Sequence, residues 1–394
     1  MTRRAGTPRW VLLAALALVA FNLRSVMTSV SPLVLTIQQA TGWTDITMGS
    51  LTTLPVLLMG VFALVVPAIA TRVGRRRTVW LAMLVLTIAM AVRLAALVPG
   101  VLHVSAILGG IGIALAAGLV PGIVREQMPD AIGAVTGMWT ASMFAGAALA
   151  AGLTVPIAMW TGSWQEALAV WAVPAAAAWI AWTIVERPYA ERGARSGGGG
   201  LRLRSLPWRS RPAWALTAYM AVNSIVFYST VAWTATSYEE RGWSPQASGF
   251  LFAVSAAGQV IAALLLPWTA HRFHRLRTML AVTTGVTMLA LILIGTAPAF
   301  LPVIVLVVFG FVHSGGFAVS LSLLSSYAKD ASSSARLTAM AYSVTYVVAA
   351  AGPLVTGAIL QWSGSWAIVF GVLAAVTAVQ FPAIAVLRRD VRIA

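Results

Sequence analysis

The sequence predicts an all-α membrane protein with twelve transmembrane helices, arranged as two parallel repeats of six. Its composition, its regularly spaced apolar runs and an internal repeat lead to this prediction. The 394 residues are 60% hydrophobic and only 9% charged, whereas about 25% of the residues in a soluble domain are charged. So few charges could not cover the surface of soluble domains, and the chain is therefore expected to lie in lipid.

Twelve apolar runs are long enough to cross a membrane. A transmembrane helix needs roughly 20 mainly apolar residues to span about 30 Å of hydrocarbon, and a helix satisfies its own backbone polar groups within lipid. The predicted spans are 10–37, 46–70, 78–98, 102–124, 132–158, 166–185, 213–236, 247–268, 278–297, 301–325, 337–360 and 366–386. The first run is too long for the core of a signal peptide and is predicted to be a retained span.

The distribution of charge sets the predicted orientation. Of the 26 basic residues, all but Arg24, Arg93 and Arg241 fall at the N-terminus, in loops that follow even-numbered spans, or in the C-terminal tail. Cytoplasmic loops carry an excess of Lys and Arg, so both termini are predicted to be cytoplasmic. The net charge of +16 thus reflects membrane topology, and no nucleic-acid partner is expected.

An internal repeat divides the chain into two halves. The basic segment ATRVGRRRT at 70–78 recurs as AHRFHRLRT at 270–278, and WTGSW at 160–164 recurs as WSGSW at 362–366. Because six is an even number of spans, both copies enter the membrane from the same side. The predicted units are an N-terminal six-helix bundle (1–185), a cytoplasmic linker with a flexible SGGGG segment (186–212) and a C-terminal six-helix bundle (213–394).

The two bundles, the long central loop and the basic loops after spans two and eight resemble the major facilitator superfamily of transporters. The family's loop motif, G-x-x-x-D-x-x-G-R-R/K, is matched only in its second part, because Pro67 and Thr71 stand in place of the first Gly and the Asp. A charge relay built on that Asp is therefore not expected here. The candidate gating residues in these loops are Gly74, Arg75, Arg76 and, in the second copy, Arg275.

Three further segments narrow the resemblance. FNLRSVMTSVSPLV (21–34), LTTLPVLLMG (51–60) and GGIGIALAAGLVPGIVREQ (109–127) are similar to the cyanate and nitroimidazole transporter branch of that superfamily. The resemblance implies a secondary active transporter of the cytoplasmic membrane, with alternating access to a site near the midplane between the bundles. It implies a small planar solute, either a cyanate-like anion or, as the alternative, a neutral nitroimidazole-like drug that is exported.

Two arginines inside spans are the strongest candidates for the site. Arg24 lies 14 residues after Trp10, near the bilayer centre at 1.5 Å per residue, and Arg93 lies at a similar depth in span three. A central arginine costs about 2.5 to 3.5 kcal/mol to insert, and all ten acidic residues lie in loops or at span ends. The missing counter-charge favours an anionic substrate at Arg24, while Arg93 either faces the path or extends toward the outer surface.

Polar and aromatic residues at plausible depth complete the candidate set. Asn22 and Thr28 accompany Arg24 on span one, where Thr28 follows at the helical i+4 spacing. The other candidates are Trp139, Tyr219, Asn223, Gln259, His313 and Tyr346. His313 is either a proton acceptor or a helix-packing hydrogen-bonding residue, and packing between helices is the alternative role for each of the others.

Other classes of protein are disfavoured. The chain has no cysteine, and no spacing of His and Glu inside a span suggests a metal site or a nucleophile with its base. An enzyme is therefore not expected, nor is any cofactor. The expected partners are a small-molecule substrate and the lipid bilayer, and the chain is expected to act as a monomer.

Overall fold

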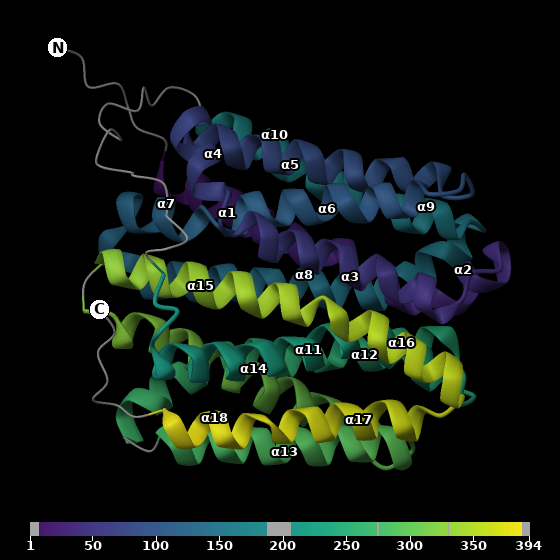
Figure 1. The fold of residues 1–394 in the computed structure, drawn as a ribbon. Helices are drawn as coiled ribbons and strands as arrows, with labels where there is room; N and C mark the ends of the chain where they lie inside the picture. Colours follow the sequence, from purple (N-terminus) through teal and green to yellow (C-terminus); the bar gives the residue numbers. More distant parts are fainter. Residues whose placement is uncertain (1–7, 187–205, 274–275, 330, 388–394) are drawn as a thin grey trace.

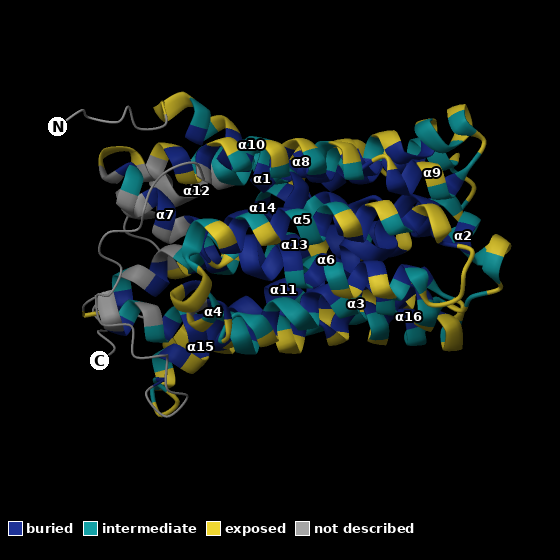
Figure 2. Ribbon diagram, turned by 90° about the horizontal axis from the view of Figure 1, so that it is seen from above, coloured by how far each residue is buried: buried dark blue, intermediate teal, exposed yellow. Residues whose placement is uncertain are grey.

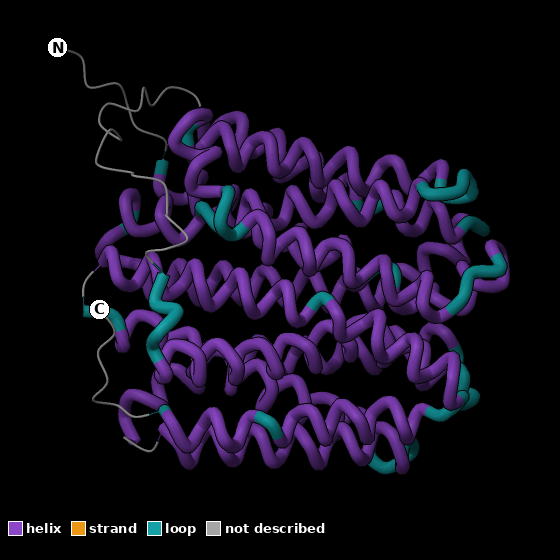
Figure 3. Tube along the Cα trace, in the orientation of Figure 1, coloured by secondary structure: helices purple, strands orange, loops and turns teal. Residues whose placement is uncertain are grey.

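The computed structural model describes residues 8–186, 206–273, 276–329 and 331–387, and these are nearly all helical. The helices run side by side along one long bundle, with the short loops at its two ends (Figures 1 and 3). Within the described part of the chain, ten helices are long and apolar enough to cross a membrane. The prediction of an all-helical membrane protein is confirmed. The predicted linker at 186–212 lies mostly outside the described residues.

The twelve predicted spans coincide with single helices, with pairs of helical segments or, for the first span, with three segments. In chain order these are α1 (Arg9–Thr28) with η1 (Ser31–Leu33) and α2 (Val34–Thr41); α3 (Asp45–Phe62) with α4 (Val66–Val73); α5 (Arg75–Ala91) with η2 (Val92–Ala95); α6 (Val101–Ala117) with α7 (Val120–Gln127); η3 (Pro129–Ala131) with α8 (Ile132–Thr161); α9 (Trp164–Ala169) with α10 (Ala172–Glu186); α11 (Arg211–Glu239); α12 (Pro245–Phe273); α13 (Leu276–Thr296); α14 (Pro302–Tyr327); α15 (Ala331–Ala349) with α16 (Ala351–Ser363); and α17 (Trp366–Ala378) with α18 (Gln380–Val386).

Proline marks three of the breaks within spans. Pro32, Pro67 and Pro121 each occupy one of the first two positions of the segment that follows a break, namely η1, α4 and α7. Proline has no amide donor to give to the preceding turn, so it is tolerated at the start of a helix and interrupts one elsewhere. The α-helix is therefore interrupted within each of these three spans.

The repeat seen in the sequence is also present in the packing. A Cβ atom on Gly110 of α6 would lie 2.6 Å from the Cα of Pro55 in α3, and one on Gly310 of α14 would lie 2.0 Å from the carbonyl oxygen of Ser255 in α12. The second contact repeats the first, because Gly310 and Ser255 each lie 200 residues after Gly110 and Pro55. Each half thus crosses its second and fourth spans at a glycine, where two backbones come into direct contact.

Matching tryptophans lie at the outer ends of the two halves. Trp160, near the end of α8, and Trp362, near the end of α16, expose 87% and 85% of their surface. Each helix then ends at a left-handed glycine, Gly162 with φ of 70° and Gly364 with φ of 60°. Exposed tryptophans at helix ends are typical of the belt where a membrane protein meets the lipid headgroups.

Buried residues line the helix faces inside the bundle, and exposed residues lie on its outer faces and at its ends (Figure 2). Leu94, Leu97, Val173 and Ile180 are each more than half exposed, whereas Trp182, Tyr228 and Phe370 are almost wholly buried. A surface covered by exposed leucine, valine and isoleucine would be unstable in water. The outer surface is therefore suited to contact with lipid acyl chains.

The two halves meet in an outer seam, formed by η1, α3 and α8 on one side and by α11, α12, α15 and α16 on the other. Thr53 Oγ1 donates to the carbonyl oxygen of Ala350 at 2.7 Å, and Ser31 Oγ donates to that of Ala232 at 3.2 Å. A Cβ atom on Gly49 would lie 2.7 Å from the Pro353 carbonyl oxygen. These contacts lie on the outer side of the midplane in the predicted orientation, so that side is closed.

Carboxylates from both halves lie at the outer edge of this seam. Glu240 follows α11 and accepts a hydrogen bond from the indole of Trp366 at 2.7 Å, while Asp45 begins α3 and accepts one from Gln38. Partial burial raises the pKa of the Glu240 carboxyl above its usual range. The Trp366 hydrogen bond lowers this pKa, the Asp45 charge raises it and Arg241 lowers it, and the net shift is upward.

The closed seam should therefore be favoured by acid on the outer side. Opening the seam separates Glu240 from Asp45 and hydrates both, so the pKa of Glu240 is higher in the closed state than in the open one. Protonation thus stabilises closure at low pH, and this stabilisation is lost as the pH rises through the raised pKa. Spin labels on cysteines introduced at Glu166 and Gln361 would measure the outer separation, and Glu240→Gln should make that distance less dependent on pH. An unchanged pH dependence in this variant would contradict the assignment.

Candidate functional site

Arg24 lies between the two halves near the middle of the bundle. Its guanidinium carbon is 5.8 Å from the ring centre of Phe144 on α8, and 4.3 and 5.7 Å from those of Phe227 and Tyr228 on α11. We call these three rings the Arg24 cage. A cation over an aromatic face within about 6 Å gains roughly 0.5 to 2 kcal/mol, so the cage stabilises the positive charge without supplying a hydrogen-bond acceptor to Nη1.

The charge of Arg24 has no counter-charge in the described structure. Its Nη1 atom is buried without a hydrogen-bond partner. Where the structure describes acidic residues, these lie in loops or at the ends of helices: Asp45, Glu126, Asp130, Glu166, Glu186, Glu239 and Glu240. A guanidinium stays protonated at accessible pH, so this site presents a permanent positive charge with a free donor to any ligand that reaches it.

Two lines of aromatic rings extend from the cage into the C-terminal half. Tyr228 contacts Tyr346, with ring centres 6.3 Å apart, and Tyr346 contacts Tyr342 on the same helix, α15. Phe227 stacks on His313 of α14, with ring centres 6.2 Å apart and planes inclined by 8°. The structure thus brings Tyr346 and His313, two of the sequence candidates, into contact with the cage.

The cage itself was not among the sequence candidates. Phe227 lies one further step of four residues beyond Tyr219 and Asn223, so helical spacing could have identified it. A phenylalanine in an apolar span, however, does not by itself indicate a binding site. For Phe144 and Tyr228 no such signal is present.

Arg93 is buried within the N-terminal half and does not join the cage. It is 2% exposed, and its donors reach Ser105 Oγ at 2.8 Å, Ser29 Oγ at 3.0 Å and the Val26 carbonyl oxygen at 2.7 Å. Val26 lies in the last turn of α1, where backbone carbonyls lack helical partners. Arg93 thus secures the end of α1 to η2 and α6, and it neither reaches the Arg24 cage nor extends to the outer surface.

Asn22 and Thr28 differ in their surroundings. Asn22 donates to the carbonyl oxygens of Leu18 at 2.8 Å and of Pro174 on α10 at 3.0 Å, so its side chain faces the neighbouring helix rather than the cage. Thr28 donates to the carbonyl oxygen of Arg24 at 3.0 Å and is buried. Both side chains therefore contribute hydrogen bonds to the helix around Arg24.

The C-terminal candidates are buried at helix contacts. Asn223 donates to the His313 carbonyl oxygen at 3.2 Å, and the Tyr219 carbonyl oxygen accepts from Gln380 at 3.1 Å. His313 Nε2 and Gln259 Oε1 are buried without partners. Trp139 on α8 is half-buried and packs against a hydrophobic core cluster that includes residues of both halves.

The predicted gating loop is a tight turn between α4 and α5. Gly74 has φ of 94°, a conformation that side chains with a Cβ rarely adopt, and Arg75 begins α5. Arg76 donates to the Val185 carbonyl oxygen at 2.9 Å, and its own carbonyl oxygen accepts from the Trp182 indole at 2.9 Å. Arg76 thus ties α5 to the end of α10, and Arg275 lies outside the described residues.

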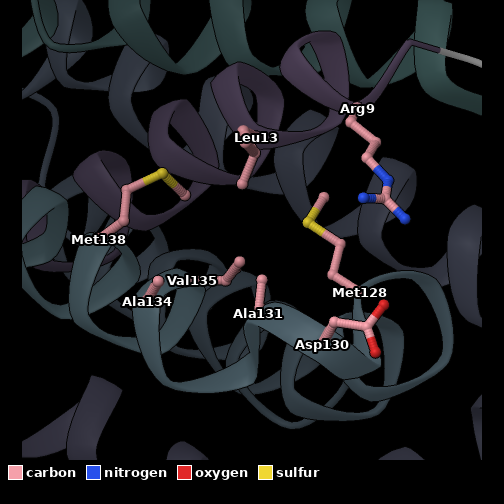
Figure 4. A pocket seen from close by; sticks show the side chains of 8 residues that line it. All are labelled: Arg9, Leu13, Met128, Asp130, Ala131, Ala134, Val135 and Met138. Carbon is pink, nitrogen blue, oxygen red and sulfur yellow. The ribbon is translucent and has the colours of Figure 1, made fainter.

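A pocket of about 330 Å³ opens at the end of the bundle where α1 begins. Leu13 reaches into it from α1, and Val135 reaches into it from α8 (Figure 4). Arg9 and Asp130 place one charge of each sign on its rim, and Met128 and Met138 add thioethers. Leu13 lies about three helical turns before Arg24 on one face of α1, so the pocket is on the cage's side of that helix.

Comparison with known proteins identifies the family of the chain. Residues 13–335 and 236–393 match the family model described as Major Facilitator Superfamily. A 2-nitroimidazole transporter of Escherichia coli (strain K12) is 30% identical over 367 residues, which cover 93% of this chain and 92% of its own. The cyanate transport protein CynX of the same organism is 30% identical over 364 residues, covering 90% and 91%. The uncharacterized transporter YycB of Bacillus subtilis (strain 168) is 28% identical over 358 residues, covering 90% and 88%.

Solved structures show the same fold at much lower sequence identity. The nucleoside transporter NupG aligns with a TM-score of 0.74 and 13% identity, over 97% of this chain and 100% of its own. A D-xylose-proton symporter aligns with a TM-score of 0.74 and 16% identity, over 94% and 97%.

The fold and the family match define a multi-pass transporter of the cytoplasmic membrane rather than an enzyme. The chain belongs to the major facilitator superfamily. Within it, the chain is a secondary transporter related to the cyanate and nitroimidazole transporters at about 30% identity.

Proposed function

We propose that this transporter moves a small planar anion, cyanate-like in size and charge, and that Arg24 is the counter-charge that binds it. The supporting observation is the Arg24 cage: a permanent cation between the two halves, in contact with three aromatic rings and with Nη1 unpartnered. A planar guanidinium binds a small anion through parallel hydrogen bonds. The faces of the surrounding aromatic rings would favour contact with a flat solute.

Alternating access would bring this site to each side of the membrane in turn. The moving units would be the six-helix bundles 1–185 and 213–394, joined by the linker 186–212. The outer seam would close one side while the other opens, and Arg24 and Phe227, which lie in different bundles, would move relative to each other. The transporter is proposed to act as a monomer, because one chain supplies both bundles.

A neutral nitroimidazole-like aromatic is the alternative substrate. The observation that favours it is the set of aromatic faces in the cage and in the Tyr228–Tyr346 contact, which could stack on a heteroaromatic ring. A nitro group could accept a hydrogen bond from Arg24 without carrying a charge. The relatives named for cyanate and for 2-nitroimidazole support the two candidates equally.

Titration of Arg24 variants separates the two candidates. Purified protein in detergent would be titrated with cyanate, with acetate and with an N-methyl nitroimidazole that cannot ionise. A hydrogen bond to a charged group contributes about 1.5 to 3 kcal/mol, so Arg24→Gln should bind the anion roughly 10- to 100-fold more weakly. Arg24→Lys should be intermediate, because it keeps the charge but loses the planar fork.

Arg209→Gln is the matched control, since it removes one exposed cytoplasmic charge outside the site. It should bind like the wild type. Equal binding of the neutral nitroimidazole to wild type and Arg24→Gln, together with no anion binding to either, would overturn the anion proposal in favour of the drug.

A further inference from the structure

We infer that this transporter is an obligatory exchanger, in which one anion must return for each anion carried across. The inference rests on the proposed function, because it takes the substrate to be an anion bound at Arg24. It concerns a separate property: how fast the empty carrier changes sides compared with the loaded one.

Arg24 lies where the two halves move relative to each other, so the surroundings of its charge change when the carrier changes sides. Arg24 is on α1 and Phe144 on α8, both in the first half, whereas Phe227 and Tyr228 are on α11 in the second. When the halves rock, the contacts with α11 must be broken and remade. Between the two open states the site passes through a form closed on both sides, in which bulk water no longer hydrates the guanidinium.

The described surroundings offer little to neutralise that charge. Tyr228 and Tyr346 are the nearest titratable neighbours, and both are neutral phenols. His313, on the far side of the Phe227 contact, would add positive charge if it were protonated. The described acidic residues lie at the ends of the bundle. The counter-charge that remains is the substrate itself.

The size of the effect follows from the cost of an uncompensated arginine in a membrane. If the closed intermediate bears the insertion cost of a central arginine, the empty carrier should change sides about 10²-fold more slowly than the loaded one. A bound anion cancels the charge and removes this cost. Fast transport then requires an anion on both legs of the cycle.

Flux in proteoliposomes tests this inference. Uptake of ¹⁴C-cyanate at pH 8 would be measured into vesicles that contain unlabelled cyanate and into vesicles that contain none. Valinomycin with equal potassium on both sides would clamp the membrane potential, so that accumulated charge does not limit net uptake. Exchange should be about 100-fold faster than net uptake. Equal rates under this clamp would overturn the inference.

A carboxylate placed in the cage provides a second test. Phe144→Glu would give Arg24 a permanent partner, so the empty carrier should change sides faster. Spin labels on cysteines at Glu166 and Gln361, at the outer ends of the two halves, would report this change. Phe144→Gln has nearly the same size without the charge, and it should leave the empty carrier slow. Equal rates in the two variants would count against the inference.

The outcomes for the two proposals are distinct. If wild-type protein binds no anion, the proposed function fails. If the anion binds in an Arg24-dependent manner but net uptake keeps pace with exchange, only the exchange inference fails.

Discussion

Gly146→Ala is expected to prevent α8 from packing on α1 and to abolish stable folding. A Cβ atom at this position would lie 1.9 Å from the carbonyl oxygen of Phe21 and 2.7 Å from its carbonyl carbon. Both are backbone atoms, so no side-chain rotation relieves the clash. The two helices would have to separate along their length, which would also displace Arg24, three residues after Phe21. Overpacking a well-packed interior costs about 1 to 3 kcal/mol and sometimes more. A clash between backbone atoms is expected to cost an amount at or above the upper end of this range.

Thermal unfolding of purified protein in detergent would measure this effect. Gly152→Ala is the matched control on the same helix, because its Cβ would lie 3.5 Å from the Cβ of Ala253, an ordinary contact. Gly152→Ala should unfold close to the wild-type temperature, whereas Gly146→Ala should give little folded protein. Wild-type stability in Gly146→Ala would show that α1 and α8 are farther apart than described.

Arg93→Met is expected to be the second most damaging change, through stability rather than through binding. It removes three hydrogen bonds and leaves Ser29 Oγ, Ser105 Oγ and the Val26 carbonyl oxygen without this partner. An unsatisfied buried polar group costs about 1 to 3 kcal/mol. Arg93→Lys should recover part of the loss, since an ammonium keeps the charge but cannot reach three acceptors in a plane.

Comparing stability with binding distinguishes this role from a role in the path. The Arg93 variants should unfold at lower temperature, while the folded fraction binds substrate with wild-type affinity. Arg24→Gln should show the opposite pattern. A loss of substrate affinity in Arg93→Met without a loss of stability would place Arg93 in the substrate path.

The fold could be predicted from the sequence because its causes are local and repetitive. Hydrophobic runs of sufficient length, separated by basic loops, identify spans without knowledge of their neighbours. The recurrence of ATRVGRRRT as AHRFHRLRT then shows that the spans form two similar sets. Neither inference depends on which helices touch.

The site could be predicted only in part because its members are defined by contacts across the chain. The cost of placing a charge in lipid can be recognised from a single residue, so the sequence alone is enough to identify Arg24. The same reasoning leaves Arg93 open between the substrate path and the outer surface, because nothing local shows that Ser29 and Ser105 lie within reach of it. Phe144 and Phe227 become notable only when α8 and α11 are placed against α1.

Trp160 and Trp362 have a consequence for the dependence of transport on bilayer thickness. They lie at matching outer positions in opposite halves, and both are almost fully exposed. Each therefore anchors its own half in the outer headgroup layer. When the halves rock, each tryptophan moves relative to the headgroup layer. A thicker or thinner bilayer therefore changes how well the two tryptophans fit that layer in each form, and so changes the balance between the open and closed forms. Lipid chain length thus becomes a variable that acts on the transport cycle without touching the substrate site.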